Sequence, residues 1–207
     1  ALLEAMQERQ VTIGEKTYKL PSPFLVMATQ NPIEQEGTYH LPEAQLDRFL
    51  MHVLVDYPTA EEERLILLLG RKEAMEDVKR EKLIEEPIVG PEEIRAARQE
   101  VLTIYMAENI EQYLLQLVLA TRHPERYGKS LTGSIAYGAS PRATLALDRC
   151  SRAHAWLAGR DFVSPEDVQA VAHDVLRHRL LLTFEAEADG MSANHLIDEL
   201  LALVAVP

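Results

Sequence analysis

The sequence predicts an α/β segment built on a parallel sheet, followed by an all-helical domain. In residues 1–58, short apolar runs that suit strands alternate with helical patterns, and this alternation is typical of parallel sheets. From residue 59 onward the periodic segments are helical only. Two stretches there, "ASPRAT" and "VSPEDV", place serine at an N-cap and proline at the first helical position. We therefore expect one domain at residues 1–58 and a helical domain at residues 59–207.

The chain opens with "ALLEAMQERQ", which has the pattern of the last turns of an amphipathic helix. Leu2, Leu3 and Met6 fall on one side of this helix. Neither an initiator methionine nor a helix cap precedes the pattern, so we expect the chain to begin inside a domain whose front half lies upstream. In "VTIGEKTYKL", which follows, two β-type runs at residues 11–13 and 17–20 flank a glycine-containing turn. This arrangement predicts a hairpin.

Two continuous apolar runs, at residues 24–29 and 51–55, predict buried strands. Apolar side chains on both faces of a strand are expected where helices cover both faces of the sheet. Between these runs, "PEAQLDRF" at residues 42–49 predicts a short helix with proline in its first turn. The first strand meets a proline at residue 32, which prevents it from continuing.

The helical domain is predicted from segments with the period of an amphipathic helix. Ser140 and Ser164 are expected to accept hydrogen bonds from the first N–H groups of two of these helices. The acidic segment at residues 73–90 is the best candidate for a linker. The helices are expected at residues 59–69, 91–100, 110–122, 140–157, 164–180 and 192–204.

Composition restricts the class of protein. The chain has 207 residues, of which 47% are hydrophobic and 26% charged, as in ordinary globular proteins. No apolar run is long enough to span a membrane, and no secretory signal opens the chain. Its one cysteine, Cys150, suits a reducing compartment, so we expect a cytoplasmic location. The net charge of −12 repels phosphate backbones, which makes nucleic acid an unlikely partner.

Two local matches to functional motifs fail on their context. "GKS" at residues 128–130 resembles the end of a phosphate-binding loop, but that loop requires glycine where this chain has His123. The histidines do not have the spacing of metal ligands, because His173 and His178 are on different faces of their helix. We therefore expect neither a phosphate-binding loop nor a metal site within the chain.

Three polar residues are candidates for a ligand site. Asn31 follows the end of a predicted strand, where ligands bind to parallel sheets, although Asn-Pro there is also an ordinary turn signal. Arg48 ends a short helix just before the next strand, and the alternative reading is an arginine that caps the helix. Arg142 lies in the first turn of a helix, where the dipole disfavours a cation. A nearby anion would explain Arg142, and the alternative is a side chain that points into water.

These residues and their surroundings closely resemble the MoxR family of AAA+ ATPases. The resemblance is carried by "ALLEAMQERQVTIG", "FLVMATQNPIEQEGTYHLPEAQLDRF" and "YGASPRA", and it covers nearly the whole chain. It implies that residues 1–58 are the back half of a P-loop NTPase sheet with a pre-sensor hairpin, and that residues 59–207 are the helical lid. The Walker A loop and the Walker B carboxylates of the family are expected upstream of Ala1, so we predict that this chain alone is inactive.

By the same resemblance, Asn31 is the sensor-1 residue, Arg48 the arginine finger and Arg142 the sensor-2 arginine. The implied cofactors are ATP and Mg²⁺, with the Mg²⁺ ligands upstream. Asn31 would orient the attacking water or the γ-phosphate, Arg48 would act in trans on a neighbour's γ-phosphate, and Arg142 would contact the ATP phosphates.

The resemblance further implies a homo-oligomeric, hexameric ring that remodels or assembles protein complexes, with a von Willebrand factor A-domain protein as a possible partner class. Two alternatives stay open at this point. One is a non-enzymatic helical interaction module. The other is a helicase-type AAA+ DNA motor, which the scarcity of cations near the hairpin tip disfavours.

Overall fold

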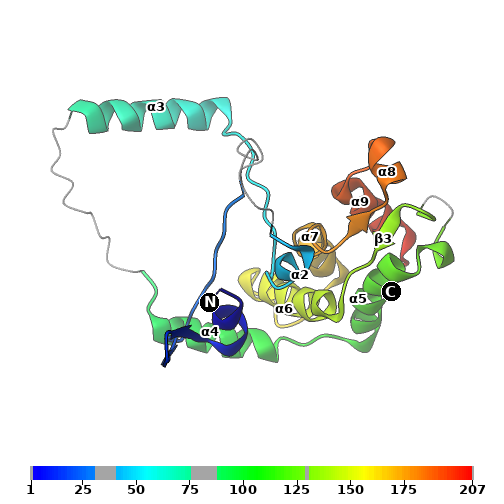
Figure 1. Cartoon of the computed structure of the whole chain (residues 1–207), viewed down its shortest axis with the longest axis horizontal. Helices are drawn as coiled ribbons and strands as arrows, with labels where there is room; N and C mark the ends of the chain where they lie inside the picture. Colours follow the sequence, from blue (N-terminus) through cyan, green and yellow to red (C-terminus); the bar gives the residue numbers. More distant parts are fainter. Residues whose placement is uncertain (1, 31–40, 76–87, 129–130, 207) are drawn as a thin grey trace. The chain divides into compact units, whose positions relative to one another are not determined.

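The computed structural model describes residues 2–30, 41–75, 88–128 and 131–206 (Figure 1). By its internal contacts the chain divides into two units. One unit comprises Ala1–His52 together with Pro91–Pro207, and the other comprises Val53–Gly90. The predicted linker at residues 73–90 lies largely outside the described residues. The division into domains at residues 58 and 59 stays a prediction.

The amino-terminal elements form as the sequence predicts. Helix α1 (Leu2–Glu8) precedes strands β1 (Gln10–Ile13) and β2 (Lys16–Lys19), which pair antiparallel as a hairpin. The turn begins at Gly14, whose φ of +62° is one that glycine adopts without strain. The carboxylate of Glu4 accepts hydrogen bonds from the backbone N–H (3.1 Å) and hydroxyl (2.5 Å) of Thr12. These bonds fasten the helix to the hairpin.

The two predicted buried strands are absent. The chain is extended at residues 24–29 and 51–55, but neither segment is paired as a strand. Leu25 is 75% exposed and Val55 is 91% exposed. A parallel strand needs neighbouring strands for its N–H and C=O groups. No strand among the described residues lies beside these two runs, so that part of the chain does not contain the predicted parallel sheet.

Two helices differ in length from their predictions. The helix expected at residues 42–49 is a single turn, α2 (Glu43–Leu46), followed by further turns. Helix α3 (Ala60–Met75) runs longer than the predicted 59–69 and lies in the Val53–Gly90 unit. Its apolar run, residues 65–69, is exposed within that unit.

Helices α5, α6, α7 and α9 pack around one hydrophobic core. Helix α6 contacts α5 and α7, and α9 contacts α5 and α7 in turn (Figure 1). Leu117, Leu147, Val168 and Leu196 are fully buried where these helices meet. The helices are α4 (Pro91–Thr103), α5 (Glu108–Arg122), the 3₁₀ turn η1 (Pro124–Arg126), α6 (Pro141–Leu157), α7 (Pro165–Leu176), α8 (Phe184–Ala188) and α9 (Ala193–Leu203).

The predicted serine caps are confirmed. Ser140 Oγ accepts a hydrogen bond from the backbone N–H of Arg142 at the start of α6. Ser164 starts α7, and its backbone N–H donates to the carboxylate of Asp167 at 2.8 Å in a capping box. Each serine is followed by proline at a first-turn position, where the missing N–H costs nothing.

The helical region is not purely helical, which corrects the prediction. Strands β3 (Ile135–Tyr137) and β4 (Leu181–Leu182) pair antiparallel beside the helices. Helix α7 also ends at Leu176, four residues before its predicted end. The chain turns there, and Arg179 is thereby placed to bind backbone carbonyls of residues 47–50. Among the described helices, none is long and apolar enough to cross a membrane.

Candidate functional site

The structure brings one of the three predicted site residues into a polar cluster. Asn31 lies outside the described residues. Arg48 follows Asp47, which is the C-cap residue of α2. Arg142 lies in the first turn of α6, and its Nη1 donates to Asp47 Oδ2 at 3.0 Å. Arg142 and Asp47 are 95 residues apart in sequence.

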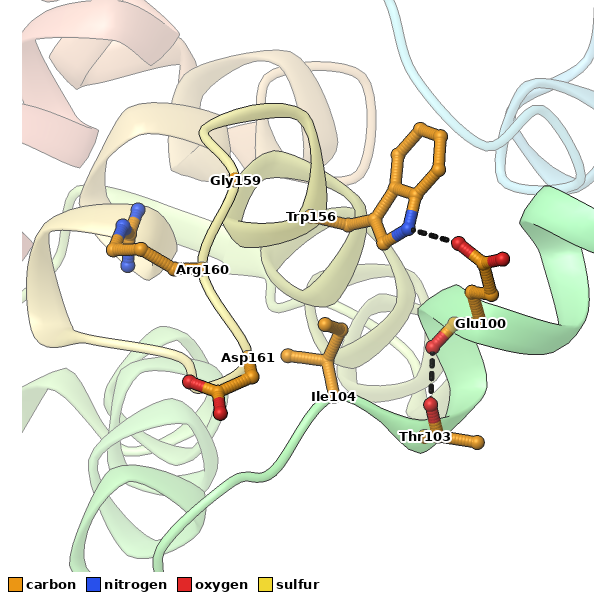
Figure 2. A pocket seen from close by; sticks show the side chains of 7 residues that line it. All are labelled: Glu100, Thr103, Ile104, Trp156, Gly159, Arg160 and Asp161. Atoms are coloured by element: carbon orange, nitrogen blue, oxygen red, sulfur yellow. Dashed lines mark hydrogen bonds between the residues drawn. The ribbon is translucent and has the colours of Figure 1, made fainter.

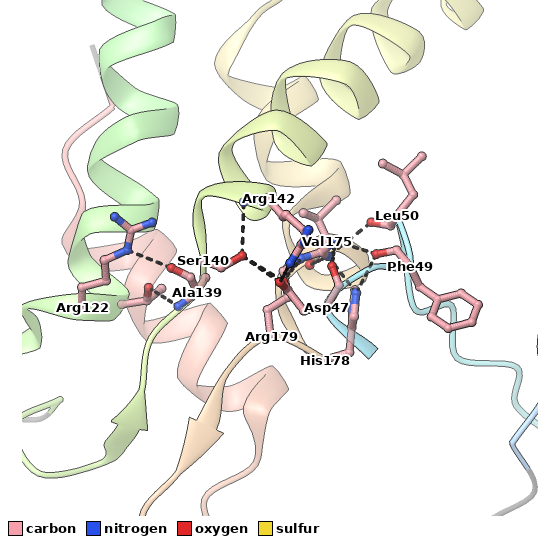
Figure 3. Close-up of polar contacts among 11 residues, drawn as sticks. Asp47, Phe49, Leu50, Arg122, Ala139, Ser140, Arg142, Val175, His178 and Arg179 are labelled. Carbon is pink, nitrogen blue, oxygen red and sulfur yellow. Dashed lines mark hydrogen bonds and ion pairs between the residues drawn. The ribbon is translucent and has the colours of Figure 1, made fainter. Parts of the chain in front are cut away.

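The Asp47 carboxylate is the centre of this cluster (Figure 3). Besides Arg142, it accepts hydrogen bonds from Ser140 Oγ at 3.0 and 2.9 Å and from Arg179 Nε at 3.2 Å. The Asp47 side chain is only 16% exposed. A carboxylate removed from water to this extent needs such donors, and two cations and a hydroxyl provide them.

Asp47 supplies the anion that the position of Arg142 calls for. A cation in the first turn of a helix is unfavourable unless a negative charge lies nearby. Arg142 lies there, with its side chain 48% exposed, and its guanidinium is paired with Asp47. The alternative, an arginine that only points into water, is therefore wrong for this structure.

Arg179 is the residue that sequence reasoning missed. Its side chain is 2% exposed, and it donates to the carbonyl oxygens of Asp47 (3.3 Å), Phe49 (2.6 Å) and Leu50 (3.3 Å). It also donates to the carbonyl of Val175 in the last turn of α7. Arg179 thus joins the segment after α2 to the helical region. No motif marks it, because its acceptors are backbone atoms some 130 residues away.

Local charges shift the pKa values in this cluster. Burial raises the pKa of Asp47, but hydrogen bonds from Arg142 and Ser140 and the charge of Arg179 outweigh it, so the net shift is downward. Burial and the charge of Arg179 lower the pKa of His178 to about 4. Asp47 is therefore an anion and His178 neutral near pH 7. The ring of His178 lies against the same segment, with Nε2 3.1 Å from the carbonyl oxygen of Phe49.

Arg48 differs from the arginines around it. Its Nε and Nη1 atoms are shielded from solvent and have no hydrogen-bond partner within the part of the chain that the structure describes. An arginine that caps α2 would donate to the last carbonyls of that helix. Neither of these atoms makes such a bond, so the capping interpretation has no support from them.

Comparisons with known proteins agree with the resemblance to MoxR-type AAA+ ATPases that the sequence motifs indicate. A family model for the ATPase family associated with various cellular activities (AAA) matches residues 1–51, and one for the AAA lid domain matches residues 132–200. The chain is 46% identical over its whole length to "Chaperone MoxR1" of Mycobacterium tuberculosis. It is 34% identical to "Protein MoxR" of Paracoccus denitrificans, again over its whole length.

The chain belongs to the MoxR family of AAA+ ATPases. A crystal structure of a Cytophaga hutchinsonii protein assigned as an ATPase matches all of this MoxR-family chain and 61% of its own, with a TM-score of 0.87 and 42% identity. The chain spans 53% of the Mycobacterium tuberculosis protein and 62% of the Paracoccus denitrificans protein. The cluster at Asp47 joins the two matched regions, because Asp47 lies in the first and its donors lie in the second.

A second set of hydrogen bonds, next to the Asp47 cluster, joins His52 to the end of α7 in this MoxR-family chain. Arg177 Nη1 donates to the carbonyl of His52 at 2.5 Å, and the backbone N–H of His52 donates to the carbonyl of Asp174 at 2.8 Å. Residues 47–52 are thus held against the end of α7 by backbone as well as side-chain hydrogen bonds. The position of Arg48 is fixed by the residues on either side of it.

A surface pocket lies elsewhere in the MoxR-family chain (Figure 2). It is lined by residues of the end of α4, the end of α6 and the α6–α7 loop, among them Glu100, Trp156 and Asp161. The indole N–H of Trp156 donates to Glu100 at 2.9 Å. The guanidinium of Arg160 donates hydrogen bonds to the carboxylate of Asp167, so it is not available to a ligand in this pocket. The pocket shares no residue with the Asp47 cluster.

The donor set at Asp47 fits a phosphate, while the described residues do not fit a metal ion. Ser140, Arg142 and Arg179 already hold a carboxylate, which is an oxyanion like a phosphate. Within the described residues, no group of His, Cys, Asp or Glu side chains is arranged to hold a metal.

Proposed function

We propose that the protein carrying this chain is a MoxR-type ATPase that hydrolyses ATP in a homo-oligomeric ring. The proposed consequence is remodelling or assembly of protein complexes, in a hexamer located in the cytoplasm. Protein clients, including a von Willebrand factor A-domain partner, fit the net charge of −12 better than DNA does. The observation that carries the proposal is the family match together with Arg142, a half-exposed cation beside a built oxyanion site.

Arg142 is proposed to bind the phosphates of ATP. It lies at the start of α6, where the helix dipole also favours an anion. Its side chain is 48% exposed, so its guanidinium is accessible to a ligand from solvent. When bound, ATP would supply the phosphoryl group and the anionic charge, and Arg142 would link that charge to the position of the lid.

Arg48 is proposed to act in trans on the γ-phosphate of a neighbouring subunit. Its support is the pair of shielded nitrogens that lack a partner in the described part of the chain. A guanidinium without a partner is costly, and an incoming phosphate would relieve that cost. Asn31 is proposed to orient the attacking water or the γ-phosphate. Phosphoryl transfer needs little from the protein beyond such positioning and charge neutralisation.

Substitutions at the two arginines test this function in the intact protein. Arg142→Ala should weaken ATP binding, measured by calorimetry, because a phosphate contact is lost. Arg48→Ala should leave ATP binding and assembly intact while hydrolysis falls by about 10³-fold or more, as for other arginine fingers. Arg48→Lys should not restore the rate fully, because an ammonium lacks the planar fork.

The matched control is Arg149→Ala, which removes an exposed arginine from the same helix as Arg142. It should bind and hydrolyse ATP like the unmodified protein. Unchanged binding in Arg142→Ala together with an unchanged rate in Arg48→Ala would refute the proposed roles. Loss of folding in Arg48→Ala would instead favour a structural arginine.

A further inference from the structure

The oxyanion site formed by Ser140, Arg142 and Arg179 is occupied by a side chain of the same protein. The Asp47 carboxylate receives all three donors at 2.9–3.2 Å (Figure 3). The donors belong to the region matched by the lid model, and Asp47 to the region matched by the ATPase model. An internal anion therefore occupies the place that a phosphate would be drawn to.

The two arginines of this site are held very differently. Arg179 is buried and donates to four backbone carbonyls as well as to Asp47, so it cannot leave without exposing several unpaired groups. Arg142 is 48% exposed, and among the described residues its guanidinium makes one hydrogen bond, from Nη1 to Asp47 Oδ2. Arg142 is thus the one donor of the pair that is free to change partners.

We propose that Asp47 is a positioning residue that holds Arg142 away from phosphate and releases it when nucleotide binds. The inference rests on the proposed role of Arg142 as a phosphate ligand, and it adds the residue that competes with the nucleotide for it. Asp47 retains Ser140 and Arg179 as partners throughout, so its carboxylate is not left unpaired when Arg142 departs.

The energetics allow this exchange of partners. Ion pairs with one exposed member shift an equilibrium by about fivefold at most, so Asp47 holds Arg142 only weakly. A triphosphate carries more charge than a carboxylate and accepts two parallel N–H bonds from one guanidinium. Nucleotide should therefore win the competition, and Asp47 should set the concentration at which it does so.

The exchange takes place beside the proposed finger. Asp47 is the C-cap of α2, and Arg48 is the next residue. Arg142 bound to Asp47 therefore adds one more bond to the segment that carries Arg48, and its release removes that bond. The proposal accordingly connects the phosphate state of Arg142 to the residue that would serve the neighbouring subunit.

The test compares Asp47→Asn with a matched variant in the intact protein, titrated with a non-hydrolysable ATP analogue. Asparagine still accepts from Ser140 and Arg179 but has no charge to hold Arg142. Asp47→Asn should bind the analogue about three- to fivefold more tightly, because the competing ion pair is removed. The control is Asp148→Asn, which removes the same charge from α6 and breaks the pair with Arg152. The affinity of this control for the analogue should stay within about twofold of that of the unmodified protein, because salt screens the loss of one surface charge.

The double variant Asp47→Asn/Arg142→Ala distinguishes the proposed role of Asp47 from the proposed phosphate role of Arg142. If Asp47 acts through Arg142, the gain in affinity should vanish in the double variant. A gain that persists there, or one that Asp148→Asn matches, would overturn the role of Asp47 while leaving the proposed function intact. If Arg142→Ala alone binds the analogue normally, the phosphate role of Arg142 fails, and the role of Asp47 falls with it.

A second measurement keeps the proposal testable if Asp47→Asn does not fold. Nitrogen-15 NMR of the arginine side chains of the unmodified protein can be followed while tripolyphosphate is added. The Nε resonance of Arg142 should shift, while that of Arg179 should stay in place. Resonances that shift together, or not at all, would contradict a selective release of Arg142.

Discussion

The helical region of Pro91–Pro207, called the lid below, and the Val53–Gly90 unit contain similar apolar residues but bury them to opposite degrees. In the lid, Leu117, Leu147 and Leu196 are completely buried among α5, α6, α7 and α9. In the other unit, the five consecutive apolar residues of α3 (residues 65–69) are between 47% and 63% exposed. Both sets of side chains lie in well-formed helices.

This difference shows that an apolar pattern specifies a helix but not its partner. The lid helices supply one another's partners, so their pattern suffices to build a core. The apolar run of α3 needs other elements to cover it, and none does so among the described residues of the Val53–Gly90 unit. Asp47 and Arg48, for which we propose functional roles, lie in a segment that the lid fixes through Arg177 and Arg179.

Truncation of one leucine in each region should give the largest contrast in stability. Leu147→Ala removes a fully buried side chain and should lower the free energy of unfolding by about 3 kcal/mol, because a cavity is left in the lid core. Leu67→Ala, at a site 53% exposed, should change it by less than about 0.5 kcal/mol. Urea unfolding followed by circular dichroism measures both. Equal losses would show that the two regions are packed alike.

A smaller effect is expected from the buried carboxylate of the lid. Asp167 is fully buried and accepts from Arg160 (2.6 and 2.5 Å), from the backbone N–H of Ser164 (2.8 Å) and from His154 Nδ1 (2.6 Å). Asp167→Asn keeps the shape of the side chain but replaces one accepting oxygen with an NH₂ group, which cannot accept these hydrogen bonds. This change should lower the free energy of unfolding by about 2 kcal/mol. The control, Asp198→Asn, loses only an exposed pair with His173 and should cost less than about 0.5 kcal/mol. Similar costs for the two variants would deny the network a role in stability.

A pH dependence of stability is expected where residues 47–52 contact the lid through His178. His178 has a pKa of about 4 in the folded chain, against an ordinary value of 6.5. Below pH 6.5 the unfolded chain therefore binds a proton that the folded chain does not accept until about pH 4. The free energy of unfolding should fall as the pH is lowered through this window, and it should be fully regained above pH 6.5.

Urea unfolding at several pH values between 6.5 and 5.0 measures this slope. This range lies above the ordinary pKa values of Asp and Glu, so most carboxylates contribute little to the slope. In His178→Gln the slope should flatten, because the titrating ring is gone. An equal slope in that variant would assign the pH dependence to other groups.

Local features of the fold were predictable from the sequence, and long-range features were not. The hairpin at Gly14 and the caps at Ser140 and Ser164 depend on neighbouring residues, and the structure confirms them. The strands expected at residues 24–29 and 51–55 had the right composition, but pairing depends on distant elements. The β3–β4 pair was missed for the same reason, because its strands are short and far apart in sequence.

In the candidate site, too, local features could be predicted from the sequence and long-range contacts could not. The need of Arg142 for an anion followed from its place in the first turn of a helix. That Asp47 supplies the anion, and that Arg179 holds the segment around it, followed only from the folded chain, because neither contact has a local signature. The roles of Asn31, Arg48 and Arg142 stay predictions that rest on the family.

The most direct test of the proposed function is to mix two variants of the intact protein, Asn31→Ala and Arg48→Ala, each of which should hydrolyse ATP very slowly alone because it lacks a proposed catalytic residue. If Asn31 acts within its own subunit and Arg48 on its neighbour, some interfaces in mixed rings pair an intact Asn31 with an intact Arg48. With random assembly about a quarter of the interfaces should be complete, so hydrolysis should return to a similar fraction of the normal rate. A mixture that stays inactive after subunit exchange has been demonstrated would contradict an arginine finger supplied in trans.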